Sequence, residues 1–345
     1  MTRAISTTVL ALVLMASALP AEEPFGTFNL RTGLFRRLFR PFVDKATPTR
    51  YPIVLAHGIC GFDKLRWGPI EVRYFHGIEQ HLRERGFDVF TSDVPPTGSI
   101  EARATALAEQ IRRRYPDGKV NILAHSMGGL DTRYMIARLG MADRIASVTM
   151  VSTPNHGTLL ADWFVYYAQQ RFPSIEKLAK ALGIDLAGFH DLSVRHMELT
   201  FNPAVPDDPR VVYRSLAGAQ KFRNYFVPLM ATHAINRALE KTLLRQPLDA
   251  GDGKALRKLA AGDGRLVHAL SEKGFQEALR DLPREWLRPE LAGRTDGMVG
   301  MSSARRGQYL GDLDADHLDE MGWLTTFDAK GLYEALATRL AEDGY

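Results

Sequence analysis

The sequence has 345 residues, 45% of them hydrophobic and 24% charged, which is typical of a globular protein with one large core or two smaller ones. Its formal net charge is only +4 and no block of lysines and arginines occurs, which excludes nucleic acid as the predicted partner. The single cysteine, Cys60, excludes an intramolecular disulfide.

The first 21 residues have the pattern of a signal peptide. Arg3 precedes a mostly apolar run at 9–18, and Ala21 offers a small residue for cleavage. The run is too short to span a bilayer comfortably, so we expect an exported protein, periplasmic or extracellular. The segment 22–50 has leucines and phenylalanines at helical spacing among arginines, and we interpret it as an N-terminal arm. This arm either packs on the core or contacts a membrane surface.

From residue 51 onward, short apolar runs alternate with amphipathic stretches. This alternation favours a single α/β domain, 51–345, with a mostly parallel central sheet flanked by helices. We predict strands at 52–56, 87–90, 120–124, 145–151 and 210–216, and helices at 78–85, 100–114 and 130–139.

Two helical segments interrupt the alternation, at about 158–205 and 220–290, and we interpret them as lid or cap insertions between strands of one sheet. The first contains an unusually broad apolar face around Trp163 to Tyr167. Two interpretations of this face remain open: a lid that opens toward lipid, or a helix that covers the core.

A predicted strand runs directly into the sequence AHSMGG at residues 124–129, which is followed by a predicted helix. A small residue, then x-Ser-x-Gly, between a strand and a helix is the pattern of a nucleophile elbow. Such a turn strains the backbone at the serine and requires small residues two positions away on either side. The turn presents the hydroxyl at a helix N-terminus, where developing negative charge is stabilised. Ser126 is therefore the predicted nucleophile.

The loop after the first predicted strand reads HGICG at residues 57–61. A tetrahedral oxyanion needs two backbone N–H groups aimed at one point. The residue after the nucleophile, Met127, supplies one donor, and we assign the Ile59 amide as the second because its neighbouring glycines let the loop approach closely. We interpret His57 as a support for this loop rather than as the catalytic base, and Cys60 as a packed thiol.

A nucleophilic serine needs a base, and the base needs an orienting carboxylate. On an elbow of this type the acid and then the histidine follow the serine along the chain. Asp296 lies on a glycine turn that we expect to enter a short strand, and His317 follows in a loop expected to be solvated. Asp263 and His268 form a weaker pair, because they are close together within a helical insertion. Asp296 and His317 are the predicted acid and base, and this chemistry requires no cofactor.

These motifs resemble, in order along the chain, the true lipases of Gram-negative bacteria, the pseudomonad-type triacylglycerol lipases of the α/β-hydrolase superfamily. The resemblance covers roughly residues 50–165 and 210–330 and implies the α/β-hydrolase fold. It places the nucleophile, acid, base and oxyanion donors at the positions already chosen. The segments that carry it are YPIVLAHGICGFD (51–63), YFHGI (74–78), KVNILAHSMGG (119–129), STPNHGT (152–158), YRSLAG (213–218), TDGMVG (295–300) and DHLDE (316–320).

The resemblance also implies a structural calcium ion near the histidine loop. Asp319 matches one ligand position, but Trp323 stands where the family has a side-chain amide, and no residue within 252–290 can be assigned as the partner aspartate. Asp319 is therefore the single candidate metal ligand. The disulfide that the family often has cannot form with one cysteine.

We predict a secreted lipase or carboxylesterase that cleaves acylglycerol-type lipid esters through an acyl-enzyme on Ser126. The predicted partner is the lipid or ester substrate, met at a membrane or lipid–water interface. Two alternatives remain: another acyl hydrolase or acyltransferase of the same fold, acting on phospholipid or polyester, and a non-catalytic hydrolase fold that serves as a binding protein. The sequence does not indicate whether a folding helper is needed.

Overall fold

The protein is represented by a computed structural model. It describes Lys254, Leu282 and the ranges 46–61, 64–67, 70–171, 186–220, 227–247, 285–324 and 327–345. The predicted signal peptide, most of the predicted arm, and the pair Asp263 and His268 lie outside the described residues. Within the described part, no helix combines the length and the apolar character needed to cross a membrane.

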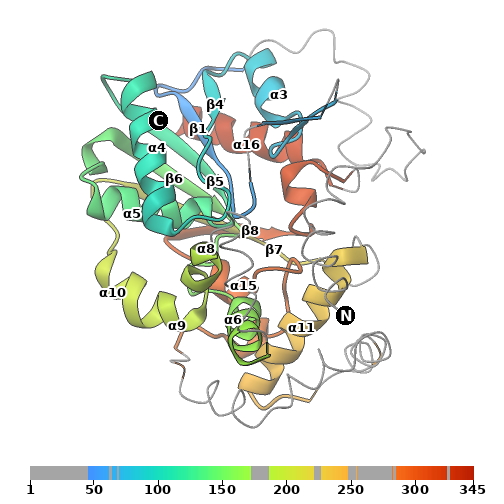
Figure 1. The fold of residues 1–345 in the computed structure, drawn as a ribbon. Helices are drawn as coiled ribbons and strands as arrows, with labels where there is room; N and C mark the ends of the chain where they lie inside the picture. The colour runs from blue at the N-terminus through green and yellow to red at the C-terminus, as the bar shows by residue number, and fades with distance from the viewer. Residues whose placement is uncertain are drawn as a thin grey trace, which may run out of the picture.

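The centre of the molecule is a six-stranded sheet in which each strand runs parallel to its neighbours, in the order β4-β1-β5-β6-β7-β8 (Figure 1). The predicted parallel sheet is confirmed. An antiparallel hairpin and the last strand of the sheet were not predicted; β8 has a partly exposed sequence without an apolar run. The strands are β1 (Ile53–Ala56), β2 (Lys64–Trp67), β3 (Ile70–Arg73), β4 (Val89–Thr91), β5 (Val120–His125), β6 (Ile145–Val151), β7 (Val212–Gly218) and β8 (Gln308–Leu313).

Helices cover both faces of the sheet, as its buried central strands β1, β5 and β6 require. Successive side chains of a strand point to opposite faces, so Val54 and Ala56 of β1 pack against α4 and α5, whereas Ile53 and Leu55 pack against α3 and α16. Figure 1 shows these two helical layers on either side of the strands. The helices are α3 (Ile78–Glu84), α4 (Ile100–Arg114), α5 (Gly128–Arg138) and α16 (Ala329–Glu342).

The predicted insertions supply further helices beside the sheet (Figure 1). Between β6 and β7 lie α6 (Leu159–Arg171), α8 (Ala187–Asp191), α9 (Val194–His196) and α10 (Asn202–Ala204), and between β7 and β8 lie α11 (Val227–Leu243) and α15 (Met301–Ala304). The 3-10 helices are Ala142–Arg144, Pro289–Leu291 and Asp319–Met321, and Met197–Phe201 is a π-helix.

The apolar face of α6 is buried in this structure. Leu159 and Trp163 pack against Ile235, Leu239 and Leu243 of α11 in one apolar cluster. The indole of Trp163 is only 6% exposed. A core-covering helix and a closed lid would both bury these two side chains, so both interpretations of the segment stay open.

Candidate active site

The elbow after β5 has the strained geometry expected of it. Ser126 has a φ of 55°, in the left-handed region that side chains rarely adopt. Its amide donates to the Val151 carbonyl at 2.9 Å, and the Thr153 hydroxyl donates to its carbonyl at 2.8 Å. A Cβ on Gly128 would lie 2.3 Å from the Ala56 carbonyl oxygen, so the turn has room only for glycine there. The backbone of β1 and β6 therefore holds Ser126 at the carboxyl edge of the sheet.

The loop after β1 contacts this serine directly. A Cβ on Gly58 would lie 2.6 Å from the Ser126 Cβ and 2.7 Å from the Tyr74 hydroxyl oxygen. The Cys60 amide donates to the Pro96 carbonyl at 2.6 Å. The side chain of Cys60 is exposed, so the packed thiol expected at this position is wrong. Its backbone bends outward at a φ of 56°, which turns the side chain away from the core.

Arg103 of α4 holds the same loop from beneath. Its side chain is 0% exposed, and its Nη2 donates to the carbonyl oxygens of His57 at 2.7 Å and Gly58 at 3.2 Å. Its Nε donates to Asp131 Oδ2 at 2.9 Å, which supplies the opposite charge. Burial raises the pKa of Asp131 to about 6 even though Arg103 acts to lower it. A buried arginine at this place fixes the loop backbone by several hydrogen bonds at once.

His57 takes part in the loop and is poorly suited to act as a base. Its Nδ1 donates to the Gly58 carbonyl at 2.9 Å, and its Nε2 accepts from the Val94 amide at 3.3 Å. Burial, with the charge of Arg103, lowers the pKa of His57 to about 3. Both ring nitrogens are therefore occupied in a neutral ring, as expected for a histidine that supports a loop.

The two amides predicted as oxyanion donors lie in a region where several backbone amides, including those of Gly58 and Gly128, have no acceptor among the described residues. The amides of Ser126, Cys60 and Gly61 donate to carbonyls within the protein. Among the described residues, no acceptor is found for the amides of Ile59 and Met127. Buried backbone N–H groups are seldom left without a partner, and such pairs are typical of sites that bind a developing negative charge.

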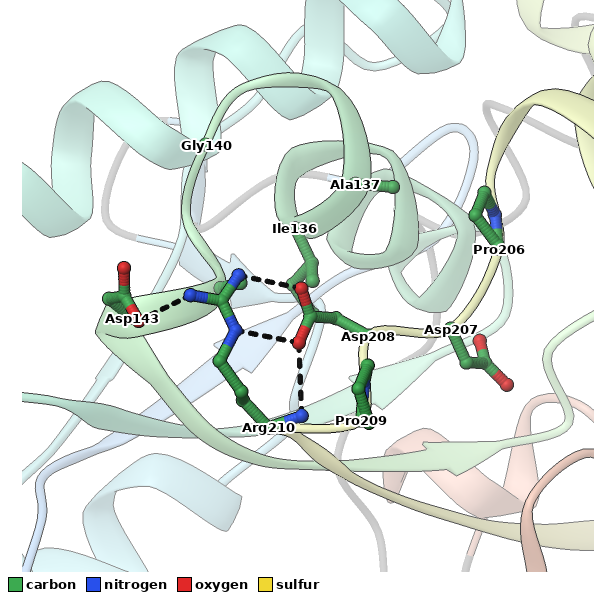
Figure 2. A pocket seen from close by; sticks show the side chains of 10 residues that line it. Ile136, Ala137, Gly140, Asp143, Pro206, Asp207, Asp208, Pro209 and Arg210 are labelled. Carbon is green, nitrogen blue, oxygen red and sulfur yellow. Dashed lines mark hydrogen bonds and ion pairs between the residues drawn. The ribbon is translucent and has the colours of Figure 1, made fainter.

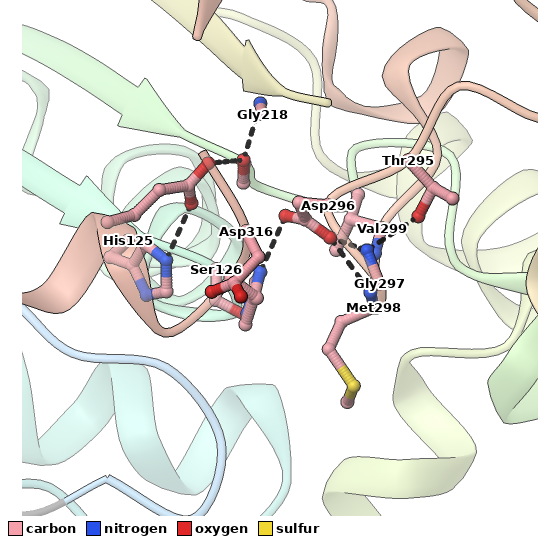
Figure 3. Close-up of polar contacts among 12 residues, drawn as sticks. His125, Ser126, Gly218, Thr295, Asp296, Gly297, Met298, Val299 and Asp316 are labelled. Carbon is pink, nitrogen blue, oxygen red and sulfur yellow. Dashed lines mark hydrogen bonds and ion pairs between the residues drawn. The ribbon is translucent and has the colours of Figure 1, made fainter. Parts of the chain in front are cut away.

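Asp296 and His317 are brought together by the fold. His317 Nδ1 donates to Asp296 Oδ2 at 2.6 Å, and the His317 amide donates to the Asp296 carbonyl at 3.0 Å. The second carboxylate oxygen accepts from the amides of Met298 at 2.8 Å and Val299 at 2.7 Å (Figure 3). The carboxylate is therefore fully engaged on the imidazole and on its own turn.

This turn does not enter a strand, contrary to the prediction. Thr295 and Gly300 form an isolated bridge, and the short helix α15 follows. The loop before His317 is also less solvated than expected, because Asp316 is 0% exposed and its Oδ1 accepts from the amides of Leu318 and Asp319. The apolar packing of α15 beneath β7 draws the turn into the core.

A second set of polar residues lies buried behind the triad candidates. His125, next to Ser126, has its ring centroid 4.5 Å from that of His317. Its Nδ1 bonds the Tyr74 hydroxyl at 2.7 Å, and its Nε2 bonds Glu320 Oε2 at 2.9 Å. Ser152 donates to the other oxygen of Glu320 at 2.7 Å and accepts from the Gly218 amide (Figure 3). Burial lowers the pKa of His125 well below its usual range and raises that of Glu320, so both side chains favour their neutral forms.

The comparisons with known proteins agree with this geometry. The family model for the alpha/beta hydrolase fold matches residues 51–179. A triacylglycerol lipase of Pseudomonas fragi is 44% identical over 123 residues, which cover 35% of this chain and 40% of that protein. A triacylglycerol lipase of Vibrio cholerae is 30% identical over 314 residues, covering 86% of this chain and 90% of that protein. The chain belongs to the lipase family of α/β hydrolases.

Solved structures share the fold of this lipase-family enzyme. The structure of EstA from Clostridium botulinum superimposes with a TM-score of 0.56 at 17% identity and covers 96% of this chain and 97% of that one. Family membership makes the protein a carboxylic ester hydrolase, a lipase or esterase. The resemblance to bacterial lipases is confirmed.

The calcium site implied by this lipase family is not formed by the described residues. Asp319 is fully buried, and its Oδ2 accepts from the Gln220 side-chain amide at 3.0 Å and from the Asp316 amide at 3.2 Å. Trp323 donates its indole N–H to the Tyr74 carbonyl instead of offering an oxygen. Calcium requires six to eight oxygen ligands, whereas N–H groups surround this carboxylate oxygen. Asp316 Oδ2 and Gln220 Oε1 are also buried beside it, and no hydrogen bond to either oxygen is found in the described part of the chain. Asp319 therefore stays the single candidate ligand.

One further group of potential metal ligands occurs among the described residues. His125, His317 and Glu320 each offer one ligand atom, and these atoms lie within 4.8 Å of one another. The hydrogen bond between His125 and Glu320 already joins two of the three. His317 also bonds Asp296, so hydrogen bonds within the site explain why these three side chains lie together.

A cavity of about 420 Å³ lies elsewhere in the enzyme, beside the charged segment Asp207–Arg210 (Figure 2). Arg210 donates to Asp208 and Asp143 at its wall. This segment precedes β7, and Asp143 precedes β6, so the cavity borders the amino ends of the strands. Open parallel sheets bind substrates at the carboxyl ends of their strands, and we do not assign the ester to this cavity.

Sequence reasoning missed Arg103 and Glu320. Arg103 had a detectable signal, because it shares the apolar face of α4 with Ile100, Ala104, Leu107, Ala108 and Ile111. Glu320 had no comparable signal in a segment rich in acidic residues. Only the fold shows that its carboxyl faces His125, which is distant along the chain.

Proposed function

We propose that the enzyme hydrolyses lipid esters through an acyl-enzyme on Ser126. His317 Nε2 takes the proton of the Ser126 hydroxyl as its oxygen attacks the ester carbonyl. Asp296 holds the imidazole by its Nδ1–H and stabilises the imidazolium that forms. His317 then returns the proton to the leaving alcohol, and a water molecule repeats the attack on the acyl-enzyme. No cofactor is needed for these steps.

One observation carries this proposal: His317 bonds Asp296 at 2.6 Å, and its ring lies 4.5 Å from that of His125, the residue before the strained Ser126. The sequence around Ser126 supports the nucleophile, and the His125 ring contacts that of His317, which brings the base loop to the elbow. We assign the Ile59 and Met127 amides as oxyanion donors because no acceptor within the described residues engages them.

We propose acylglycerol-type lipids as substrates, met at a membrane or lipid–water interface. The names of the relatives support this class, since those from Vibrio cholerae and Pseudomonas fragi are triacylglycerol lipases. The apolar helices around Trp163 and α11 would suit acyl chains if they open. We further propose that the protein is exported, because residues 1–21 have the pattern of a signal peptide.

The nucleophile is tested by Ser126→Ala, with Ser99→Ala as the matched control. Ser99 caps the N-terminus of α4, so its loss lowers stability without touching the chemistry. We expect hydrolysis of a nitrophenyl ester to fall about 10⁴-fold or more in Ser126→Ala and to stay near the parent value in the control. A fluorophosphonate adduct mapped to another serine, or a fully active Ser126→Ala, would disprove the assignment.

The substrate class is tested by varying the acyl chain. We expect kcat/KM on nitrophenyl esters to rise with chain length and an emulsified triacylglycerol to be cleaved. A preference for short soluble esters would make the protein an esterase, and preferential release of fatty acid from phospholipid vesicles would make it a phospholipid acyl hydrolase. Acyl transfer to an added alcohol in excess of hydrolysis would identify an acyltransferase. Sequencing the N-terminus of protein recovered outside the cytoplasm tests the export.

A further inference from the structure

Helix α11 buries two adjacent faces, because Asn236 and Glu240 each directly follow an apolar residue and so lie about 100° around the helix from it. Its apolar face, with Ile235, Leu239 and Leu243, packs against α6. The other face carries Asn236 and Glu240, four residues apart and therefore side by side on the helix. These two polar side chains are 1% and 3% exposed. Among the described residues, the hydrogen-bond partners of these two side chains belong to one short segment, residues 293–300, which we call the acid turn because it contains Asp296.

Asn236 binds the acid turn just before Asp296. Its side-chain Nδ2 donates to the Thr295 hydroxyl oxygen at 3.1 Å. The same oxygen accepts from the Gly297 amide at 3.0 Å. Asn236 and Gly297 thus donate to the same Thr295 oxygen. Because Thr295 and Gly297 flank Asp296, this contact ties the backbone on both sides of Asp296 to α11.

Glu240 binds the two ends of the same turn. Its Oε2 accepts from the Gly293 amide at 2.6 Å. Its Oε1 packs so closely on Gly300 that a Cβ there would lie 1.9 Å away. Burial raises the pKa of Glu240 to about 8, and a protonated carboxyl still has one oxygen free to accept from an amide.

The acid turn in turn sets the position of the carboxylate. Asp296 Oδ1 is held by the amides of Met298 and Val299, so the side chain cannot rotate independently of its backbone. Its Oδ2 bonds His317 Nδ1 at 2.6 Å. A shift of the turn is therefore passed directly to the hydrogen bond that orients the imidazole.

We propose that Asn236 and Glu240 are positioning residues for the reaction, which clamp the acid turn so that Asp296 stays in hydrogen-bonding distance of His317. The inference rests on the proposed roles of Asp296 and His317. The apolar contact between α11 and α6 supports the clamp, because it fixes the helix along the face next to Asn236 and Glu240.

The clamp is tested by Asn236→Ala and Glu240→Ala, with Thr242→Ala as the matched control. Thr242 lies on the same helix with an exposed side chain. We expect kcat on a nitrophenyl ester to fall roughly tenfold to hundredfold in the two clamp variants, because a displacement of about 1 Å in a catalytic array costs that much. KM should change less than about twofold, since the substrate does not contact the clamp.

Two further readouts separate positioning from a general loss of structure. Glu240→Gln keeps an oxygen that accepts from Gly293, so we expect it to restore most of the activity lost in Glu240→Ala. When the Asp296 carboxylate moves away from His317, it stabilises the protonated imidazole less. The acid limb of the pH profile of kcat/KM should therefore move to lower pH in the alanine variants. The low-field proton resonance of His317 Nδ1 should weaken in parallel.

Thr295→Val provides a variant of nearly unchanged volume that breaks the same contact from the turn side, in case an alanine variant does not fold. Parent-like kcat in Thr295→Val and Glu240→Ala would overturn the inference, as would a Glu240→Gln variant as impaired as Glu240→Ala. Asp296→Asn is measured alongside. If it keeps full activity, the assigned acid is wrong; if it is inactive while the clamp variants are normal, only the clamp is wrong.

Discussion

The elbow at Ser126 and the acid turn at Asp296 lie at the same edge of the sheet but are held in different ways. The elbow is held by backbone: Ser126 adopts a φ of 55°, and Gly128 packs directly on the Ala56 carbonyl. The acid turn is held by side chains that reach it from α11, a helix outside the sheet's two layers. A turn fixed by backbone packing depends on glycines within its own segment, whereas a turn fixed by side chains depends on residues elsewhere.

This difference also predicts how well each turn tolerates substitution. A backbone clash cannot be relieved without moving a strand, because the interior is close-packed. A clash with the end of a side chain can be relieved by rotation of that side chain. Substitutions on the elbow side should therefore cost more stability than matched substitutions on the acid side.

The largest effect is expected at Arg103, which holds the loop beside the elbow. Arg103→Met removes the buried partner of Asp131 and the donors to His57 and Gly58, and breaking such a buried pair costs about 3–5 kcal/mol. We expect the free energy of unfolding in urea to fall by that amount. Arg112→Met, on the exposed face of the same helix, should change it by less than about 0.5 kcal/mol. Equal stability of the two variants would refute the structural role of Arg103.

An intermediate effect compares the two turns directly. Gly128→Ala places a Cβ 2.3 Å from a strand carbonyl, whereas Gly300→Ala places one 1.9 Å from the end of the Glu240 side chain. We expect Gly128→Ala to cost about 1–3 kcal/mol of stability and most of the activity, and Gly300→Ala to cost less because Glu240 can rotate. Gly140→Ala at the other end of α5 isolates backbone strain, because nothing lies within 4 Å of the added Cβ but the residue has a φ of 67°. A larger loss in Gly300→Ala would contradict the comparison.

The smallest effect is the change in the free energy of unfolding just below pH 6.5 that comes from His57, in the loop beside the elbow. The pKa of His57 is about 3 in the folded protein and about 6.5 in an unfolded chain. Between these values the unfolded chain binds a proton that the folded chain does not, so stability falls as the pH drops from about 6.5 toward 3. Between pH 6.5 and 5.5 the loss is at most about 1.4 kcal/mol, which is less than the loss expected for Arg103→Met, and it accumulates as the pH falls further toward 3. Urea unfolding at several pH values should show a shallower slope in His57→Gln, and an unchanged slope would place the titration elsewhere.

Much of the fold could be predicted because its signals are local. The helix at 100–114 and the strand at 145–151 were predicted with the observed bounds, since amphipathic spacing and an apolar run suffice to define them. β8 lacks an apolar run and was missed. The expected strand after Asp296 is a turn and the short helix α15, because packing beneath β7 overrode the local preference.

The site shows the same division. Ser126 could be chosen from neighbouring letters, since the strand, the small residues and the glycines of an elbow are adjacent in the chain. Asp296 and His317 could be chosen from their order. Arg103, Glu320 and Asn236 could not be assigned roles, because each acts on a segment distant in sequence.

The alternation of apolar strands with helices, the elbow and its glycines follow from the amino-acid sequence alone, because period and turn chemistry act over a few residues. Three features exist only in the folded protein: the contact between His317 and Asp296, the buried arginine beneath the loop, and the clamp from α11. These contacts depend on which side chains become buried together, and burial is a property of the whole chain rather than of any segment.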